Sequence, residues 1–184
     1  MKTNFRAVGI DDGTFRKSKD KLCMISGVLI RADYLIESVS TRPIEVDGLD
    51  STERIVEIVN ADFKGNASLI MTCGVTFAGF NVADLFNVFK ETGIPVISVT
   101  RRKPDSQSIE EAILKTQHHY RQKLETIQRY NTEELHLPNG SLLYINRIGI
   151  EQKPAATYVK KLTRTGNIPE PVRLASIIAK SIKK

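Results

Sequence analysis

The chain has 184 residues, of which 41% are hydrophobic and 26% are charged, and it has two cysteines. This composition predicts a folded domain with its own hydrophobic core and argues against intrinsic disorder. No run approaches the roughly 18 apolar residues of a membrane-spanning helix, and two cysteines are too few for a disulfide framework. We therefore expect one domain over residues 1–184, in the cytoplasm and without a membrane partner.

The net charge of +6 is divided unevenly along the chain. Residues 93–184 carry 16 Lys and Arg against 8 Asp and Glu, whereas residues 1–92 carry 11 against 13. A metal-dependent enzyme acting on nucleic acid needs carboxylates for the metal and cations for phosphate, and this division would supply both. A solvated basic surface gives the same count, so charge alone leaves that alternative open.

The first elements are predicted to be three short strands joined by turns. Residues 5–11 form an apolar run that ends in carboxylates, residues 22–30 form a second apolar run, and residues 34–46 alternate in part. Short connections between successive strands favour an antiparallel meander. Apolar residues at helical spacing then predict a helix beginning near Ser51.

A strand–helix–strand unit is predicted next, and strands joined in this way run parallel. Its strands are residues 68–75 and 95–100, with a helix around residues 82–89 between them. The rest is mostly helical. We expect helices over 107–130, either continuous or broken near His118-His119, and over 171–184, and a further strand is one interpretation of 141–145.

This order of elements predicts the fold class. Three antiparallel strands, a helix, a strand, a helix and a fifth strand make a ribonuclease H-like α/β core. We expect a mixed five-stranded sheet, with three antiparallel strands followed by two parallel ones, and helices on both faces. A flavodoxin-like sheet is the alternative, and the opening meander without a helix argues against it.

Two acidic groups are candidate metal ligands. Asp11 and Asp12 end the first strand, and paired carboxylates there suit Mg²⁺, although a simple turn would also explain them. Asp47, Asp50 and Glu53 lie at the end of the third strand and the start of a helix, where helix capping is the alternative explanation. If the fold brings the groups together, the catalytic residues are Asp11, Asp47, Asp50 and Glu53, with Asp11, Asp12 and Asp47 as metal ligands.

The segment from Gly74 to Asp84 is rich in glycine and small residues between a strand and a helix. Free backbone N–H groups in such a loop can receive an anion or a polar base edge, and a tight turn is the alternative. The arginines after the fifth strand lie where ligands of parallel sheets bind. Our candidates for binding nucleic acid or a base are Gly74, Thr76, Gly79, Phe80, Asn81, Arg101, Arg102 and Arg173.

Three segments resemble a known family. The motifs AVGIDDG, LIMTCGVTFAGFNVADLFNVFKETGIPVISVTRR and IPEPVRLASIIA occur in the order found in an uncharacterised archaeal family distantly related to endonuclease V. The resemblance implies a ribonuclease H-like fold and Asp11 as the first metal aspartate, with Mg²⁺, or Mn²⁺ as its substitute. It also implies DNA or RNA as partner and cleavage near a deaminated base that is flipped out against residues 74–81.

The sequence departs from the endonuclease V pattern at several catalytic positions. Cys73 occupies the place of the second metal aspartate, Arg54 that of the glutamate, and Ile150 that of the histidine. Three functions therefore stay open: a nuclease with a rearranged site, a catalytically silent reader of modified nucleosides, and a small-molecule enzyme using Cys73 or Asp84. The sequence leaves open the choice between DNA and RNA, the metal and the oligomeric state.

Overall fold

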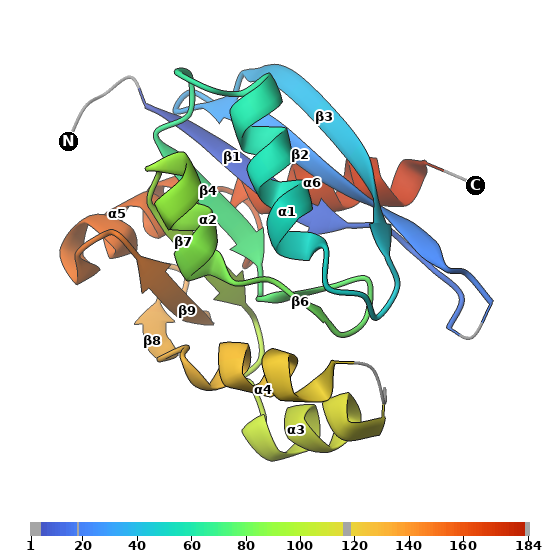
Figure 1. Ribbon diagram of the computed structural model, residues 1–184. Coiled ribbons are helices and arrows are strands. Elements are labelled where there is room, and N and C mark those ends of the chain that lie inside the picture. Colours follow the sequence, from blue (N-terminus) through green and yellow to red (C-terminus); the bar gives the residue numbers. More distant parts are fainter. Residues whose placement is uncertain (1–4, 18, 116–118, 183–184) are drawn as a thin grey trace.

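The computed structural model describes residues 5–17, 19–115 and 119–182. In this part of the chain, seven strands form one mixed sheet in the order β3-β2-β1-β4-β7-β9-β8 (Figure 1). Strands β1, β4 and β7 run parallel to one another, and every other neighbouring pair is antiparallel. The strands are β1 (Arg6–Asp12), β2 (Leu22–Arg31), β3 (Ile36–Glu45), β4 (Leu69–Cys73), β7 (Val96–Thr100), β8 (Glu133–His136) and β9 (Leu142–Ile148).

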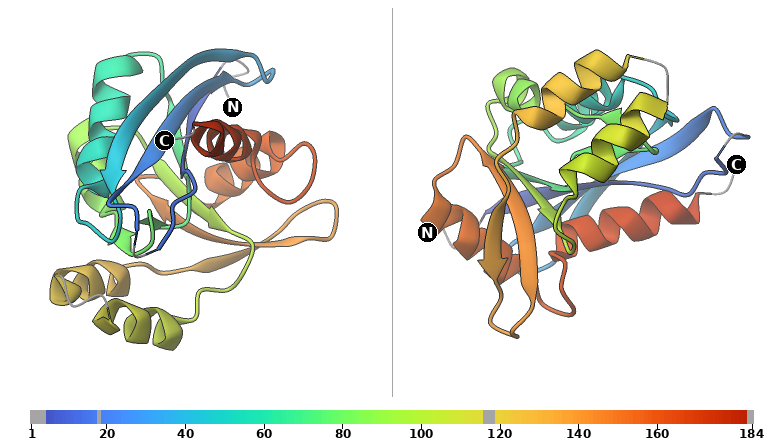
Figure 2. Two further views of the ribbon diagram at one scale, coloured as in Figure 1. Left: turned by 90° about the vertical axis from the view of Figure 1, so that its right-hand side faces the viewer. Right: turned by 90° about the horizontal axis from the view of Figure 1, so that it is seen from below.

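Helices cover both faces of the sheet (Figure 2, left). One face carries α1 (Ser51–Glu57), its π-helical continuation η1 (Ile58–Asp62) and α2 (Leu85–Thr92), and the other carries α5 (Gln152–Leu162) and α6 (Glu170–Ser181). Successive side chains of a strand point to opposite faces. Accordingly, Val8 and Ile10 of β1 are buried in the core under α1, and Ala7 is buried in the core that includes α5 and α6.

Helix α6 lies against β1 at backbone contact distance. A Cβ atom on Gly9 would overlap the carbonyl oxygen of Pro171, and one on Gly13 would lie 2.5 Å from the carbonyl oxygen of Ala179. Both positions therefore require glycine for this close approach. Ser26 of β2 adds a buried hydrogen bond from its hydroxyl to the Ala175 carbonyl, at 2.7 Å. These contacts hold α6 along the strand that ends in the carboxylates.

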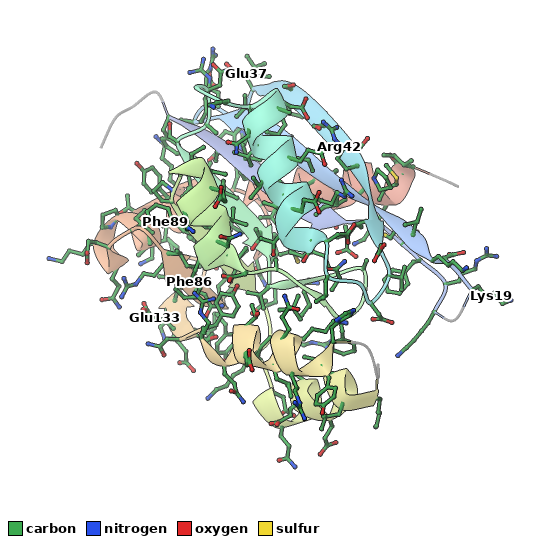
Figure 3. All side chains as sticks on the ribbon, viewed as in Figure 1. Lys19, Glu37, Arg42, Phe86, Phe89 and Glu133 are labelled. Atoms are coloured by element: carbon green, nitrogen blue, oxygen red, sulfur yellow. The ribbon has the colours of Figure 1, made fainter. Side chains whose placement is uncertain are left out.

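Helices α3 (Ser106–Lys115) and α4 (Tyr120–Gln128) form a separate pair beyond β7 (Figure 2). Tyr130, just after α4, anchors this pair: its hydroxyl donates to the Ala83 carbonyl at 2.5 Å and accepts from the Leu85 N–H at 2.8 Å. Its ring stacks on Phe86, which is labelled on α2 in Figure 3, at 5.5 Å between ring centroids. The pair is thereby fixed to the start of α2.

The sheet has seven strands, so the prediction of five was incomplete. The strand suggested at residues 141–145 is the longer β9, which pairs antiparallel with β7 and carries β8 at the sheet edge. Strand β8 has four residues, and only Leu135 among them is buried, so it leaves almost no hydrophobic pattern. The fold class is otherwise as predicted, an α/β fold with a mixed sheet between helices.

One helical region agrees with an expected alternative and one differs from expectation. The stretch 107–130 is divided into α3 and α4, as the interpretation with a break near His118-His119 has it, with His119 in a left-handed conformation (φ 53°) immediately before α4; His118 lies outside the described residues. Helix α5 was not predicted; Pro154 obscures it in the sequence but stands in the first turn, where proline is tolerated. No helix in the described ranges is long and apolar enough to cross a membrane.

Candidate active site

The end of β1 carries two neighbouring carboxyl groups that are largely removed from water. Asp11 is 7% exposed, Asp12 is half-buried, and the two side chains interact with each other. Burial raises the pKa of Asp11 to about 6, against a hydrogen bond from Ser176 that lowers it, and the charge of Asp12 raises it further. Burial also raises the pKa of Asp12. A desolvated pair of like charges of this kind favours a bound cation.

Helix α6 supplies the groups that face Asp11. Ser176 hydrogen-bonds the Asp11 carboxyl, and the positive charge of Lys180 lowers the pKa of both carboxyls. Lys180 Nζ also donates to Ser176 Oγ at 2.7 Å. Sequence reasoning missed these two residues. A signal was present, because Arg173, Ser176 and Lys180 are spaced i, i+3 and i+7 and so share one face of the helix.

Cys73 ends β4 beside this pair. Burial raises the pKa of its thiol to about 12, and the charges of Asp11 and Asp12 add to the effect. The thiol is therefore protonated near neutral pH, and a protonated thiol is a poor nucleophile and metal ligand. This environment argues against Cys73 as the reacting group of a small-molecule enzyme.

The carboxylate pair fits a hard divalent cation with few protein ligands. In the part of the chain that the structure describes, no three His, Cys, Asp or Glu side chains come together to hold a metal ion. Mg²⁺ is commonly bound through one or two carboxylates, with water and substrate phosphate oxygens completing its shell. Asp11 and Asp12 provide these two carboxylates, and their ligand atoms are oxygens, as Mg²⁺ prefers.

Asp47 and Asp50 do not join Asp11, so the predicted four-carboxylate cluster is not formed among the described residues. Asp47 Oδ1 accepts the Phe80 N–H at 2.8 Å. Asp50 Oδ1 accepts from the Asn81 side chain at 2.7 Å and from the Glu45 N–H at 3.1 Å. These carboxylates hold loops together, since each is satisfied by polar groups of the protein.

Glu53 is also separate from the pair at the end of β1. It is exposed on α1 and lines another pocket with Thr52, Asp84 and Glu91. The sequence could not reveal this separation, because an acid at a helix start carries the same local pattern whether it joins a site or faces solvent.

The glycine-rich loop positions Asp12. Its short strands β5 (Thr76–Phe77) and β6 (Asn81–Val82) form a hairpin, whose turn places Ala78 at φ 42° and Gly79 at φ 89°. The Ala78 N–H donates to Asp12 Oδ2 at 2.8 Å. In the loop predicted to receive a ligand, the N–H groups of Ala78 and of the named candidate Phe80 are therefore already bonded to Asp12 and Asp47.

The other loop residues are mostly structural. The buried Asn81 side chain accepts from the Ser51 N–H at 3.0 Å and donates to Glu45 and Asp50, so it joins three segments. Gly74, at φ 71°, allows the chain to turn after β4. Fully buried Lys123 of α4 donates to the Asp47 carbonyl at 2.5 Å, which ties the helix pair to this loop.

A pocket of 850 Å³ opens beside Asp11. Arg101 and Arg102, exposed after β7, contribute to its lining, as does Arg173 of α6. Arg173 is held by a two-oxygen contact with the carboxylate of Glu170, the shortest distance being 2.6 Å. The structure thus brings the predicted arginines to the same pocket as Asp11, at the carboxyl end of the parallel strands.

Comparison with known proteins places the chain in a family. The family model for endonuclease dU matches residues 3–183. The chain belongs to the endonuclease dU family. A "UPF0215 protein" of Thermococcus gammatolerans is 38% identical over 186 residues, covering 99% of this chain and 94% of the relative. One from Methanothermobacter thermautotrophicus is 36% identical, covering 99% and 89%.

Solved structures share the fold of this chain. A protein of unknown function from Archaeoglobus fulgidus has a TM-score of 0.83 and 31% identity to this endonuclease dU family member, covering 95% of this chain and 96% of the other. Endonuclease V of Ciona intestinalis, in complex with inosine-containing DNA, has a TM-score of 0.63 at 13% identity, covering 94% and 83%. Endonuclease V of Bacillus subtilis has a TM-score of 0.62 at 10% identity, covering 95% and 78%. The endonuclease V matches establish the fold.

Proposed function

We propose that this protein is a metal-dependent endonuclease that cleaves nucleic acid at or near a deaminated base, with deoxyuridine as the first candidate. The observation that carries the proposal is the interacting pair of buried Asp11 and half-buried Asp12 beside an arginine-flanked pocket. Carboxylates for a metal and cations for phosphate are the two requirements of this chemistry. The family description, endonuclease dU, supplies the candidate base.

Each residue has a defined role in this proposal. Asp11 and Asp12 would hold Mg²⁺ or Mn²⁺, which when bound activates a water and stabilises charge on the phosphate. Ser176 and Lys180 orient Asp11, and the Ala78 N–H orients Asp12. Arg101 and Arg102 would bind phosphates of the strand, since exposed guanidinium groups suit this contact.

A catalytically silent reader is the second candidate, and the neutral thiol of Cys73 at the end of β4 favours it. A site with two protein carboxylates binds a metal more weakly than a site with three. In a silent reader the protein therefore still binds nucleic acid but does not cleave it. A small-molecule enzyme is the weakest candidate. The pocket of 850 Å³ is large enough for a nucleotide, and three arginines at its lining suit a polyanion better than a neutral metabolite.

The test is cleavage of end-labelled DNA and RNA oligonucleotides, single- and double-stranded, that carry one deoxyuridine, inosine or unmodified base. The assay compares wild type with Asp11→Asn and with Asp33→Asn, an exposed carboxylate that pairs with Arg31. We expect Mg²⁺- or Mn²⁺-dependent cleavage near deoxyuridine, reduced at least roughly 100-fold by Asp11→Asn and unchanged by Asp33→Asn.

Cleavage that survives in Asp11→Asn would refute the proposed site. Binding of the deoxyuridine oligonucleotide without any cleavage by the wild type would establish the silent reader instead.

A further inference from the structure

The loop before α6 forms part of the pocket that Asp11 lines. Asn167 and Ile168 of this loop share the lining with Val172 and Ile177 of α6. Ile177 is 52% exposed although it is a large apolar residue. An apolar wall with a few polar groups is the composition that binds the flat face of a base. A base in this pocket would place its own nucleotide next to Asp11.

The hydrogen bonds around Asn167 fix which end of its amide faces outward. The Ser141 backbone N–H, which can only donate, bonds to Asn139 Oδ1 at 3.0 Å. Asn139 Nδ2 therefore points the other way, toward the Gly166 carbonyl at 3.2 Å and Asn167 Oδ1 at 3.5 Å. Because a donor stands there, the oxygen of Asn167 must face it.

The Ser141 hydroxyl completes this arrangement by donating to Asn167 Oδ1 at 2.9 Å. The Asn167 oxygen is thus engaged twice, whereas its Nδ2 group has no hydrogen-bond partner among residues 5–17, 19–115 and 119–182. Asn167 is exposed and lines the pocket, so its side chain offers an N–H donor there while its oxygen is held by Ser141.

We propose that Asn167 reads the deaminated base by donating a hydrogen bond from Nδ2 to the carbonyl that deamination creates. This inference rests on the proposed function and names the group that gives it specificity. Uracil carries a carbonyl oxygen where cytosine carries an amino group. A fixed donor therefore bonds uracil, but with cytosine two donors face each other and neither is satisfied. Such an unsatisfied polar pair discriminates more strongly than the bond itself attracts.

The glycine-rich loop is a weaker candidate for this reading. The N–H groups of Ala78 and Phe80 are bonded to Asp12 and Asp47, and the Asn81 amide is buried against three other segments. Reading a base there would require these bonds to break. Asn167 needs no such rearrangement, because no residue in the described ranges occupies its Nδ2 group and its oxygen stays bonded to Ser141.

The experiment measures binding without divalent metal, so that cleavage does not enter. Fluorescence anisotropy gives the affinities of wild type, Asn167→Leu and Asn167→Asp for single-stranded DNA with one deoxyuridine, deoxycytidine or thymidine at the same position. Asn66→Ala, on the exposed loop before β4, is the matched control. The isosteric Asn167→Asp keeps the shape of the loop residue and replaces the donor by an acceptor.

We expect the wild type to prefer deoxyuridine to deoxycytidine, Asn167→Leu to lower that preference about tenfold, and Asn167→Asp to lower it further or reverse it. The ratio of deoxyuridine to thymidine should not change, because thymine has the same carbonyl. Asn66→Ala should behave as the wild type.

An unchanged deoxyuridine-to-deoxycytidine ratio in both Asn167 variants overturns the inference, as does a wild type without the preference. Because cleavage is measured separately, the two proposals can fail independently. If the wild type prefers deoxyuridine through Asn167 but does not cleave, the role of Asn167 is supported and the nuclease activity is refuted. If the wild type cleaves at deoxyuridine and the Asn167 variants keep the wild-type affinity ratio, the nuclease activity is supported and this role of Asn167 is refuted.

Discussion

At the level of single residues, the carboxyl group of Asp11 is costly to ionise because it is buried, and it lies at the proposed metal centre. Burial raises its pKa to about 6 from the ordinary 3.8. The folded state therefore binds the proton more tightly than the unfolded state does. The resulting contribution to stability is present below about pH 4 and is lost as the pH rises through about 6. A carboxylate kept ionised at such a cost is typical of a functional site.

We predict that Asp11→Asn stabilises the fold at pH 7 while it removes activity. Asparagine keeps the shape and can still accept from the Asp12 N–H, but it carries no charge to desolvate. The free energy of unfolding should rise by about 1–3 kcal/mol at pH 7, and by little at pH 4. Urea denaturation at the two pH values measures this.

Asp33→Asn is the control, because the pKa of Asp33 is shifted in the opposite direction to that of Asp11. The Arg31 guanidinium lowers the pKa of exposed Asp33 to about 2, so removal of that charge cannot stabilise the fold at pH 7. If Asp11→Asn were instead less stable than the wild type at pH 7, the account of Asp11 as a strained carboxylate would be wrong.

Single residues also show how far the site could be predicted from the sequence. Asp11 and Asp12 could be proposed from a strand ending in carboxylates; their carboxyl groups interact in the structure, and their role as metal ligands stays a prediction. Asp47 and Asp50 carried the same sequence signal, an acid at a strand or helix end. Their bonds to Phe80 and Asn81 connect segments about 30 residues apart, and no local pattern encodes such a contact.

At the level of elements, the contact of α6 with β1 sets the geometry of the site. Ser176 and Lys180 reach Asp11 only because the helix backbone touches the strand, which Gly9 and Gly13 permit. Both glycines stand in the sequence segment AVGIDDG, beside the carboxylates. Their role in packing could not be read from the segment alone, since it depends on a helix more than 150 residues later in the chain.

We predict that Gly9→Ala destabilises the protein by at least about 3 kcal/mol, because the added methyl group would overlap backbone atoms of Pro171 that cannot rotate away. Gly65→Ala is the control. Gly65 has φ 79° with nothing within 4 Å of an added Cβ, so its substitution costs only about 1 kcal/mol of backbone strain. Urea denaturation compares both with the wild type. A Gly9→Ala protein as stable as Gly65→Ala would contradict the close packing of α6.

At the level of the whole molecule, the uneven charge of the sequence has a spatial counterpart. The acidic first half supplies Asp11, with Asp12 beside it, and the basic second half supplies Arg101, Arg102 and Lys180 to the pocket that Asp11 lines. Hydrophobic periodicity predicted the central strands and most helices, because the central strands are buried, but it missed β8 and α5. The parallel strands also predicted the position of the arginines after β7, whereas the contact of Ser176 and Lys180 with Asp11 could not be predicted, since it depends on the packing of α6.

The proposed metal centre consists of Asp11 and Asp12 without Asp47. The test measures Mn²⁺ binding as the loss of the EPR signal of the free ion. A deoxyuridine oligonucleotide is present, and the binding of Mn²⁺ to the oligonucleotide alone is subtracted. Wild type, Asp11→Asn and Asp47→Asn are compared; asparagine at position 47 can still accept the Phe80 N–H. We predict that Asp11→Asn weakens binding at least about tenfold and that Asp47→Asn binds as the wild type does. Undiminished Mn²⁺ binding by Asp11→Asn, or loss of binding only in Asp47→Asn, would show that Asp11 and Asp12 do not form the metal centre.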